Sequence, residues 1–197
     1  MTLNPLEPLR RVYRFYFPSV EFDLPLAVQR SQAINHLSEQ VIPGWKALFS
    51  RLEEEKLGGR VSREGVKLYR IEPIEGRPGT FKANSWRPML FADFRMRRGT
   101  LHLKGEFTIH PFVQAFTAFW LLGVFAATAF VLLMTFFHAQ FGIEESMPLS
   151  IPMTCVALLV GGTLLVRKAW QWSHDDIEFI SDFLHERVGD GAGRDSP

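Results

Sequence analysis

The chain has 197 residues, of which 47% are hydrophobic and 22% charged, so its average composition is that of an ordinary globular protein. The charge is segregated, because residues 1–110 carry 18 of the 22 Lys and Arg and a net charge of +6, whereas the remainder carries −5. The single cysteine, Cys155, excludes an intrachain disulfide framework, and we expect it to be a small packing residue.

The first 110 residues are predicted to be a cytosolic α+β part. Residues 1–7 lack an apolar core preceded by positive charge, so we expect no cleavable signal peptide. Residues 12–17 and 66–71 are rich in aromatic and β-branched residues and are predicted to be strands. Between them we expect a helix that is capped by Asp23 and runs to about Val41.

A second amphipathic stretch is expected at residues 45–52. Its apolar residues recur at helical spacing, and Gly58-Gly59 is predicted to end it, although a strand is open for part of it. Residues 53–55 are consecutive glutamates, which are typical of a solvated face.

The clearest signal in this part is a β-hairpin between residues 89 and 109. Apolar residues occupy even positions before Arg98-Gly99 and odd positions after it, and such alternation indicates strands with one buried face. A two-residue turn at Arg98-Gly99 keeps apolar residues opposite apolar ones. The pairs that follow from this turn are Met96 with Leu101, Phe94 with Leu103, Leu90 with Phe107, and Asp93 with Lys104.

Two charge-free stretches then predict a transmembrane hairpin. Residues 112–137 span about 39 Å as a helix, more than the ~30 Å hydrocarbon core, and residues 148–166 span about 28 Å. Lys and Arg flank the outer ends of the two stretches, whereas the connection carries Glu144 and Glu145. Because Lys and Arg concentrate on the cytoplasmic side, both termini are predicted to be cytosolic.

Small residues suggest how the two helices pack. Each stretch has one pair of small residues four positions apart, and such pairs let helix backbones approach in lipid. We predict contact between the faces that carry Gly123, Ala127, Ala157 and Gly161. Neither stretch contains Asp, Glu, Lys or Arg, which disfavours an ion or proton pathway built from this chain alone.

After the membrane, Ser173 and Asp176 are predicted to form a capping box that begins an amphipathic helix. Ile177, Ile180 and Leu184 lie on its apolar face, Gly189 ends it, and we expect this face to pack on the sheet. The predicted organisation is residues 1–110 cytosolic α+β part, 111–138 transmembrane helix 1, 139–147 short extracytosolic loop, 148–168 transmembrane helix 2, 169–189 cytosolic amphipathic helix and 190–197 disordered tail.

The predicted fold class is therefore α+β, with a small antiparallel sheet and flanking helices interrupted by the transmembrane hairpin. A sheet followed by a C-terminal helix resembles the pleckstrin-homology-like architecture. In addition, the segments 84–88 (Asn-Ser-Trp-Arg-Pro) and 105–113 (Gly-Glu-Phe-Thr-Ile-His-Pro-Phe-Val) resemble those of a group of bacterial two-helix membrane proteins without an assigned activity. This resemblance covers residues 60–137 and implies the architecture and a bacterial inner-membrane location, but no functional residues.

The sequence offers little support for catalysis or for a cofactor. The six histidines are scattered without metal-ligand spacing, and no phosphate-binding loop or nucleophile motif is present. We therefore predict no catalytic, cofactor or metal residues, and we do not expect nucleic acid as a partner.

Basic residues beside the membrane are the remaining candidates. Residues 60–104 hold 11 Lys and Arg against 4 acids, which fits positive-inside topology or binding of anionic lipid headgroups. The candidate headgroup contacts are Arg95, Arg97, Arg98, Lys104, Arg167 and Lys168.

Three functions remain open from the sequence. The leading hypothesis is a membrane-anchored, non-enzymatic binding module of the bacterial inner membrane, with lipids and another membrane or cytosolic protein as partners. The alternatives are an accessory subunit of a larger membrane complex and an enzyme that acts on a membrane-embedded substrate.

Overall fold

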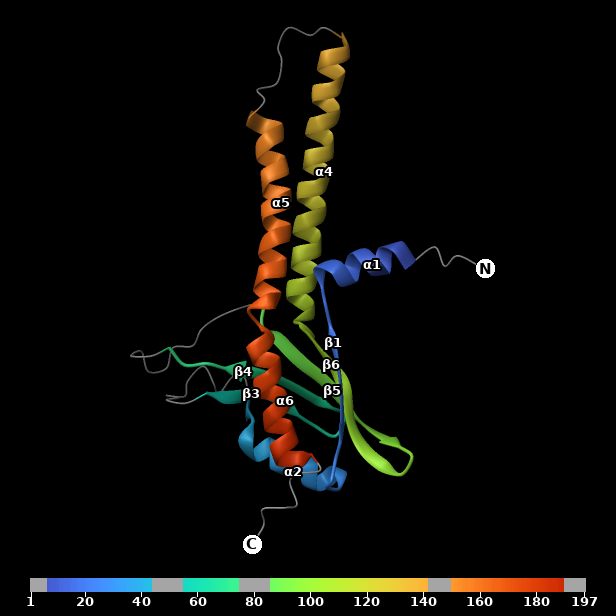
Figure 1. The fold of residues 1–197 in the computed structure, drawn as a ribbon, viewed down its shortest axis with the longest axis vertical. Helices are drawn as coiled ribbons and strands as arrows, with labels where there is room; N and C mark the ends of the chain where they lie inside the picture. Colours follow the sequence, from blue (N-terminus) through green and yellow to red (C-terminus); the bar gives the residue numbers. More distant parts are fainter. Residues whose placement is uncertain (1–6, 44–54, 75–85, 142–149, 190–197) are drawn as a thin grey trace. The chain divides into compact units, whose positions relative to one another are not determined.

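The structure is a computed structural model that describes residues 7–43, 55–74, 86–141 and 150–189. The chain forms two compact units, of which the first comprises Met1–His110 and Trp172–Pro197 and the second Pro111–Gln171. The first unit is α+β with a six-stranded sheet, and the second is a pair of long helices (Figure 1). The predicted helix at residues 45–52 lies outside the described residues.

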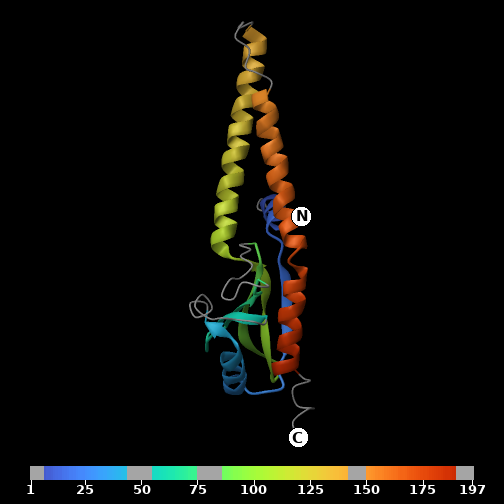
Figure 2. The same ribbon diagram turned by 90° about the vertical axis from the view of Figure 1, so that its left-hand side faces the viewer.

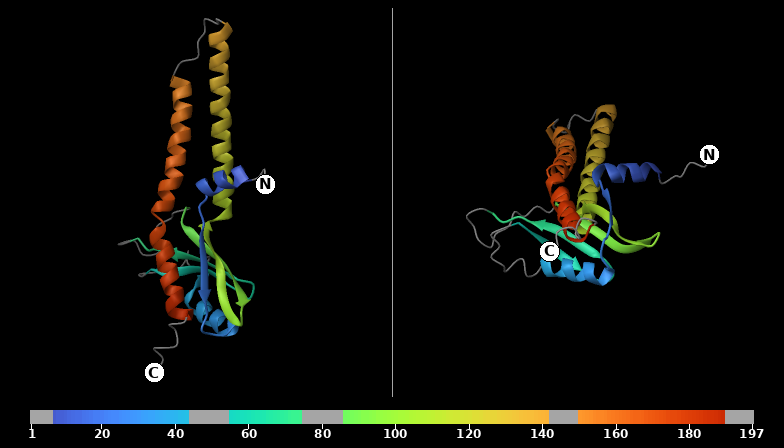
Figure 3. Two further views of the ribbon diagram at one scale, coloured as in Figure 1. Left: turned by 45° about the vertical axis from the view of Figure 1, so that its right-hand side comes forward. Right: turned by 60° about the horizontal axis from the view of Figure 1, so that its bottom comes forward.

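Among the described residues, the first unit begins with helix α1 and ends with helix α6, and its strands lie between them in the chain (Figure 3). They are α1 (Glu7–Tyr16), β1 (Val20–Pro25), α2 (Arg30–Gln40), β2 (Ile42–Pro43), β3 (Lys56–Val61), β4 (Val66–Ile71), β5 (Pro88–Arg97), β6 (Thr100–Ile109) and α6 (His174–Val188).

The strands follow the order β1-β6-β5-β4-β3-β2. All neighbours are antiparallel except the two-residue strand β2, which pairs with β3 in parallel, so the sheet is mixed and the predicted fully antiparallel sheet is wrong at this edge. β1 is the first strand in the sequence and β6 the last, but they are neighbours in the sheet. Their pairing brings together residues that lie about 80 positions apart in the sequence.

The β5–β6 hairpin has the predicted register. Met96 pairs with Leu101, and the three other predicted pairs are likewise confirmed. Arg98 and Gly99 have φ values of 52° and 86°, and positive φ at both central residues is what a type I′ turn requires. The alternation of apolar residues therefore fixed both the loop length and the buried face.

One face of the sheet, called the inner face below, carries the hydrophobic core. Leu68, Leu90 and Leu103 are fully buried there, and α2 and α6 both pack against this face. The predicted packing of α6 is confirmed, because Ile180 and Leu184 are also fully buried. Burying a leucine side chain stabilises the fold by roughly 1.5–3 kcal/mol.

The ends of α6 agree with the prediction in part. Gly189 is the C-cap residue, as expected, and its N–H donates to the Leu184 carbonyl. Ser173 is the N-cap residue, but its side chain makes no capping hydrogen bond, so the predicted capping box is wrong. The Asp176 side chain turns instead to two arginines of the sheet.

Three other local predictions are wrong. Residues 12–16 belong to helix α1 and Phe17 directly follows it, because apolar and charged residues there segregate with the helical period and not with the period of a strand. Asp23 lies inside strand β1, where Phe22 and Leu24 point inward, and α2 begins only after Gln29. Gly58-Gly59 belongs to strand β3 and ends no helix.

The second unit consists of α4 (Pro111–Phe141) and α5 (Ser150–Gln171), which lie side by side along their length (Figure 2). Both are long and apolar enough to cross a membrane. Pro111 occupies the first position of α4, where its missing N–H costs least. The structure extends the predicted helices to Phe141 and Gln171.

The two helices do not pack through the predicted small residues. Gly123, Ala127, Ala157 and Gly161 are all exposed, and a Cβ built on either glycine would meet no atom within 4 Å. The close approach occurs one residue further along α5, where a Cβ on Gly162 would lie 2.5 Å from the Trp120 ring. The helices therefore meet along a different face from the one predicted.

The positions that are buried or half-buried recur every three or four residues on both helices. This 3–4 spacing is the pattern of coiled-coil packing. The positions that follow this spacing include Thr117, Leu121, Val124 and Thr128 on α4, and Pro152, Cys155, Leu159, Gly162 and Val166 on α5. The partial burial of Cys155 along this line fits the expected packing role.

Candidate binding surface

The face of the sheet opposite the core, called the outer face below, is polar and largely exposed. On β5 and β6 the side chains that alternate with the buried ones point to it, and they include Asp93, Arg95, Lys104 and Glu106. Lys67 on β4 and Arg60 on β3 extend the same face across the sheet. Charged residues of both signs are thus interleaved over these four strands.

The outer face is hollowed beside the β3–β4 turn. The hollow has a volume of about 310 Å³, and polar and apolar atoms contribute to its walls in similar measure. Its lining residues are Arg60, Ser62, Glu64, Gly65, Val66, Lys67, Phe91, Ala92 and Asp93. A hollow of this size holds a single side chain or a small polar group.

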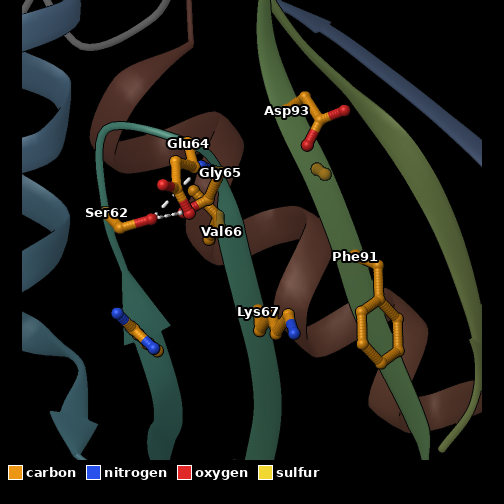
Figure 4. Close-up of a pocket in the computed structure, with 9 residues that line it drawn as sticks. Ser62, Glu64, Gly65, Val66, Lys67, Phe91 and Asp93 are labelled. Carbon is orange, nitrogen blue, oxygen red and sulfur yellow. Dashed lines mark hydrogen bonds between the residues drawn. The ribbon is translucent and has the colours of Figure 1, made fainter. Parts of the chain in front are cut away.

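Strand pairing explains why the hollow forms here. β4 and β5 pair only from Val66 opposite Ala92 to Leu68 opposite Leu90, so β5 continues past the end of β4. The turn between β3 and β4 is closed by a hydrogen bond from the Ser62 N–H to the Gly65 carbonyl, 2.9 Å long. The turn and the protruding part of β5 form two sides of the hollow (Figure 4).

Lys67 and Phe91 form the most defined contact in the hollow. They lie opposite each other on β4 and β5, and the Lys67 Nζ is 5.6 Å from the centre of the Phe91 ring. Figure 4 shows them on neighbouring strands, with Asp93 further along the strand of Phe91. The hollow thus combines the aromatic surface of Phe91 with the cations of Lys67 and Arg60 and the carboxylates of Glu64 and Asp93.

The structure separates the basic residues that the sequence suggested as headgroup contacts. Arg95 and Lys104 lie on the outer face, and Arg97 and Arg98 lie at the tip of the hairpin. Strand β6 leads from this tip to Ile109, over about 30 Å at ~3.3 Å per residue. The tip is therefore at the far end of the hairpin from the residue where the chain continues into α4.

Acidic neighbours partly neutralise these cations. Arg95 lies 3.2 Å from an Asp93 carboxylate oxygen, and Arg97 lies 3.6 Å from Asp23. The His102 ring nitrogen Nδ1 is 2.7 Å from the second oxygen of Asp23. The hydrogen bond from His102 lowers the pKa of Asp23 and, together with the charges of His102, Lys104 and Arg97, outweighs the opposing effect of burial. The outer face is thus a mixed charged surface and not a basic patch.

The two remaining candidates, Arg167 and Lys168, lie in the second unit. Both are exposed near the end of α5, and Lys168 is in its last turn, where a cation interacts favourably with the helix dipole.

A cluster of five charged residues joins α6 to the sheet. Arg70 reaches Glu55 at 2.6 Å and Asp176 at 3.3 Å. Arg87 reaches Glu72 at 2.5 Å and the other Asp176 oxygen at 3.4 Å. The Arg87 side chain also donates a hydrogen bond to the Arg70 carbonyl, 3.2 Å long. Asp176, in the first turn of α6, is therefore held by two arginines from separate segments.

Burial makes this cluster sensitive to charge. The Asp176 side chain is only 8% exposed, and this burial raises its pKa although Arg87 and Arg70 act in the opposite direction. Burial also acts to lower the pKa of Arg70, but the hydrogen bond and charge of Glu55 outweigh it, so the pKa is raised and the guanidinium stays charged. The Arg70 guanidinium further lies 4.8 Å from the centre of the Phe179 ring on α6. The cluster fixes the start of α6 on the sheet.

Sequence reasoning missed both the hollow and this cluster. The alternation in β4 contained one signal, because Arg70 follows Val66 and Leu68 at inward positions, and a charged residue there needs a partner. The hollow had no such signal, since it depends on the register between β4 and β5. Within the described residues, no group of His, Cys, Asp and Glu could hold a metal ion.

Comparison of the chain with protein-family models, with curated proteins and with solved structures found no match.

Proposed function

We propose that the chain is a membrane-anchored binding module whose outer sheet face engages a partner protein. The observation that carries the proposal is the contrast between the two faces of the sheet. α2 and α6 cover the inner face, whereas the outer face presents exposed charges around a hollow. Two helices that could cross a membrane supply the anchor. The proposed setting is the bacterial inner membrane, with both termini cytosolic.

The chemistry of the outer face favours a protein over a lipid headgroup. A headgroup site needs unpaired cations, but Arg95 and Arg97 each have an acidic neighbour. Aromatic side chains and arginines are enriched at protein interfaces, and the half-buried Phe91 lines the hollow together with Arg60. The proposed partner therefore presents a carboxylate to Lys67 and Arg60 and an apolar side chain to Phe91.

We further propose that the first unit has a pleckstrin-homology-like fold. Helix α6 follows the sheet in the chain and covers one of its faces, as expected for a pleckstrin-homology-like arrangement. In such an arrangement the last helix closes the core, and the face away from it is open to partners.

Site-specific photocrosslinking tests the proposed function. A photoreactive residue replaces Arg95 or Lys104 on the outer face of the full-length chain, and a control replaces Asp182 on the exposed side of α6. We expect one protein adduct from both outer-face positions and none from the control. The adduct should disappear when Phe91→Ala is added, because the substitution removes the apolar surface, and persist with Arg187→Glu. Absence of adducts from the outer face, or equal adducts from all positions, contradicts the proposal.

The accessory-subunit hypothesis predicts a different outcome. A stable complex through α4 and α5 would survive Lys67→Glu and Phe91→Ala and would be seen as one larger mass in native mass spectrometry. The binding-module proposal instead predicts that these two substitutions release the partner.

A further inference from the structure

Helix α1 separates charged from apolar side chains around its axis. At 100° per residue, Glu7, Arg11 and Arg14 fall on one half of the helix, and Arg11 lies 3.6 Å from Glu7 one turn earlier. Among the residues whose side chains the structure describes, those on the other half are apolar or aromatic. These are Val12, Tyr13, Phe15 and Tyr16.

The fold leaves much of this apolar half accessible. Val12, Tyr13 and Phe15 are 56%, 52% and 46% exposed, whereas Phe17, directly after the helix, is only 5% exposed. Phe17 therefore holds the end of α1 to the folded part, and the helix presents its apolar half to its surroundings. A surface helix of a globular protein would bury this half.

We propose that α1 lies in the plane of the membrane interface, with its apolar half in the headgroup region of an anionic bilayer. Interfacial helices combine arginines on the polar face with bulky apolar residues on the other. Tyrosine is enriched at membrane–water interfaces, because its ring is apolar and its hydroxyl is polar. Arginines close to an anionic lipid surface are attracted to it.

Strand pairing ties α1 to the end of the sheet from which α4 starts. Three residues separate Tyr16 from Val20, the first residue of β1, and Val20 pairs with Phe107 of β6. Four residues after Phe107 the chain enters α4 at Pro111. At ~3.3 Å per extended residue, this path limits the distance between the end of α1 and the start of α4 to roughly 30 Å. The helix is thus confined near any membrane that α4 crosses.

Charge favours a bilayer over a second copy of the chain as the occupant of this face. In two copies of α1 packed through their apolar halves, the arginines of both copies would lie on the outer sides and contribute nothing to the contact. An anionic lipid surface places opposite charge beside Arg11 and Arg14. The inference assumes that α4 and α5 span the bilayer, as proposed above.

Nitroxide scanning of the full-length chain tests the inference. Cys155→Ser removes the native cysteine, and single cysteines are then introduced at Val12, Tyr13 and Phe15 and, as matched controls on the polar half, at Arg11 and Arg14. The labelled proteins are reconstituted into phosphatidylcholine vesicles with and without phosphatidylglycerol. Collision rates with oxygen, which partitions into lipid, and with a water-soluble nickel complex give the depth of each label.

We expect oxygen to dominate at the three apolar positions and nickel at the two control positions, and phosphatidylglycerol to deepen the apolar labels. The double substitution Arg11→Glu/Arg14→Glu should remove the effect of phosphatidylglycerol. Labels that all contact the nickel complex, or apolar positions shielded from both reagents, overturn the inference, because the helix is then in water or packed on protein.

Labels at Phe119 and Leu164, exposed on α4 and α5, report separately on the membrane anchor. Oxygen-rich collisions there together with an aqueous α1 refute only the interfacial helix. Nickel-accessible labels at both positions refute the membrane anchor itself.

Discussion

The β5–β6 hairpin and the α4–α5 pair differ in how far polarity determines their packing. In the hairpin, polar and apolar residues alternate, and a shift of one residue would expose the whole core face. The register from Met96 opposite Leu101 to Leu90 opposite Phe107 therefore has one low-energy solution. Water provides the contrast that selects it.

The helix pair lacks this contrast. All sides of α4 and α5 are apolar, and in lipid no hydrophobic force selects the contact face. The choice between Gly161 and its neighbour Gly162 then depends on shape, and the Trp120 ring fits against Gly162. A pattern of small residues alone does not distinguish the two. The comparison thus shows where sequence patterns carry information about packing and where they do not.

The largest effect is expected in the sheet of the first unit, where the alternation of polar and apolar residues determines the packing. Leu103→Ala, at a fully buried inner-face position, should destabilise the first unit by about 2–5 kcal/mol, because it removes buried methyl groups and leaves a cavity. Lys104→Ala, the next residue on the outer face, should change stability by less than about 0.5 kcal/mol. Urea unfolding of the full chain in detergent, followed by circular dichroism, measures both. Equal effects would mean that the two faces are not distinct.

The second prediction tests whether polarity also fixes α6. Asp176→Ala should destabilise the first unit by about 1–3 kcal/mol, because it leaves two partly buried arginines without a shared acceptor. Asp176→Asn should destabilise the unit less, because the amide keeps an acceptor oxygen. It also removes the charge of a carboxyl group whose pKa is already raised by burial.

Asp182→Ala, on an exposed part of α6, is the matched control and should be near neutral. The same urea titration compares the three variants. A cost of Asp176→Ala no larger than that of Asp182→Ala would show that the charge cluster does not hold the helix.

The third prediction concerns the contact between α4 and α5, which depends on the shapes of the side chains. Gly162→Leu should force α4 and α5 apart by on the order of 1–2 Å, because a side chain there meets the Trp120 ring. Gly161→Leu, one residue away, points to open space and should leave the spacing unchanged. Electron–electron distances between nitroxides at Phe116 and Leu165, in the Cys155→Ser background, report the spacing. If Gly161→Leu separates the helices and Gly162→Leu does not, the original small-residue assignment is correct.

The same contrast explains what the sequence predicted in the first unit. The β5–β6 hairpin and the apolar face of α6 are predicted correctly, because each has a long, regular period, and strand β4 is predicted correctly from its aromatic and β-branched residues. Strand β1 has the period too, with Phe22 and Leu24 inward, but Asp23 was interpreted as a helix cap. In β1 the alternation of apolar residues is a better signal than the preference of Asp23 for helix caps.

Other features depend on contacts between distant segments. The β3 strand contains Gly58, whose lack of a side chain looks unfavourable until the Ile71 and Tyr69 side chains are seen to cover it. Similarly, the outer-face hollow requires the β3–β4 turn to lie beside Asp93 of β5. No local pattern contains this information, because the pairing of β4 with β5 creates it.

The smallest effect on stability is expected for the Asp23 carboxylate on the exposed outer face. The hydrogen bond from His102 lowers the pKa of Asp23 below its ordinary value of 3.8, so this carboxylate binds protons more weakly in the folded than in the unfolded state. Its contribution to stability is therefore present above pH 3.8 and is lost as the pH falls through the lowered pKa. The difference in urea midpoint between wild type and Asp23→Asn should accordingly be small and positive near neutral pH and vanish in acid.

Glu21→Gln, an exposed change on the same strand and the same face, serves as the control for effects of strand substitution. The Asp23 contact joins β1 to β6, the pair of strands furthest apart in sequence, so its loss should loosen this edge before the hairpin. Hydrogen exchange measured separately for each strand distinguishes loosening of the β1–β6 edge from loosening of the β5–β6 hairpin. If the midpoint difference were independent of pH, the carboxylate would not be stabilised by its charge, and polarity on the outer face would matter only for binding.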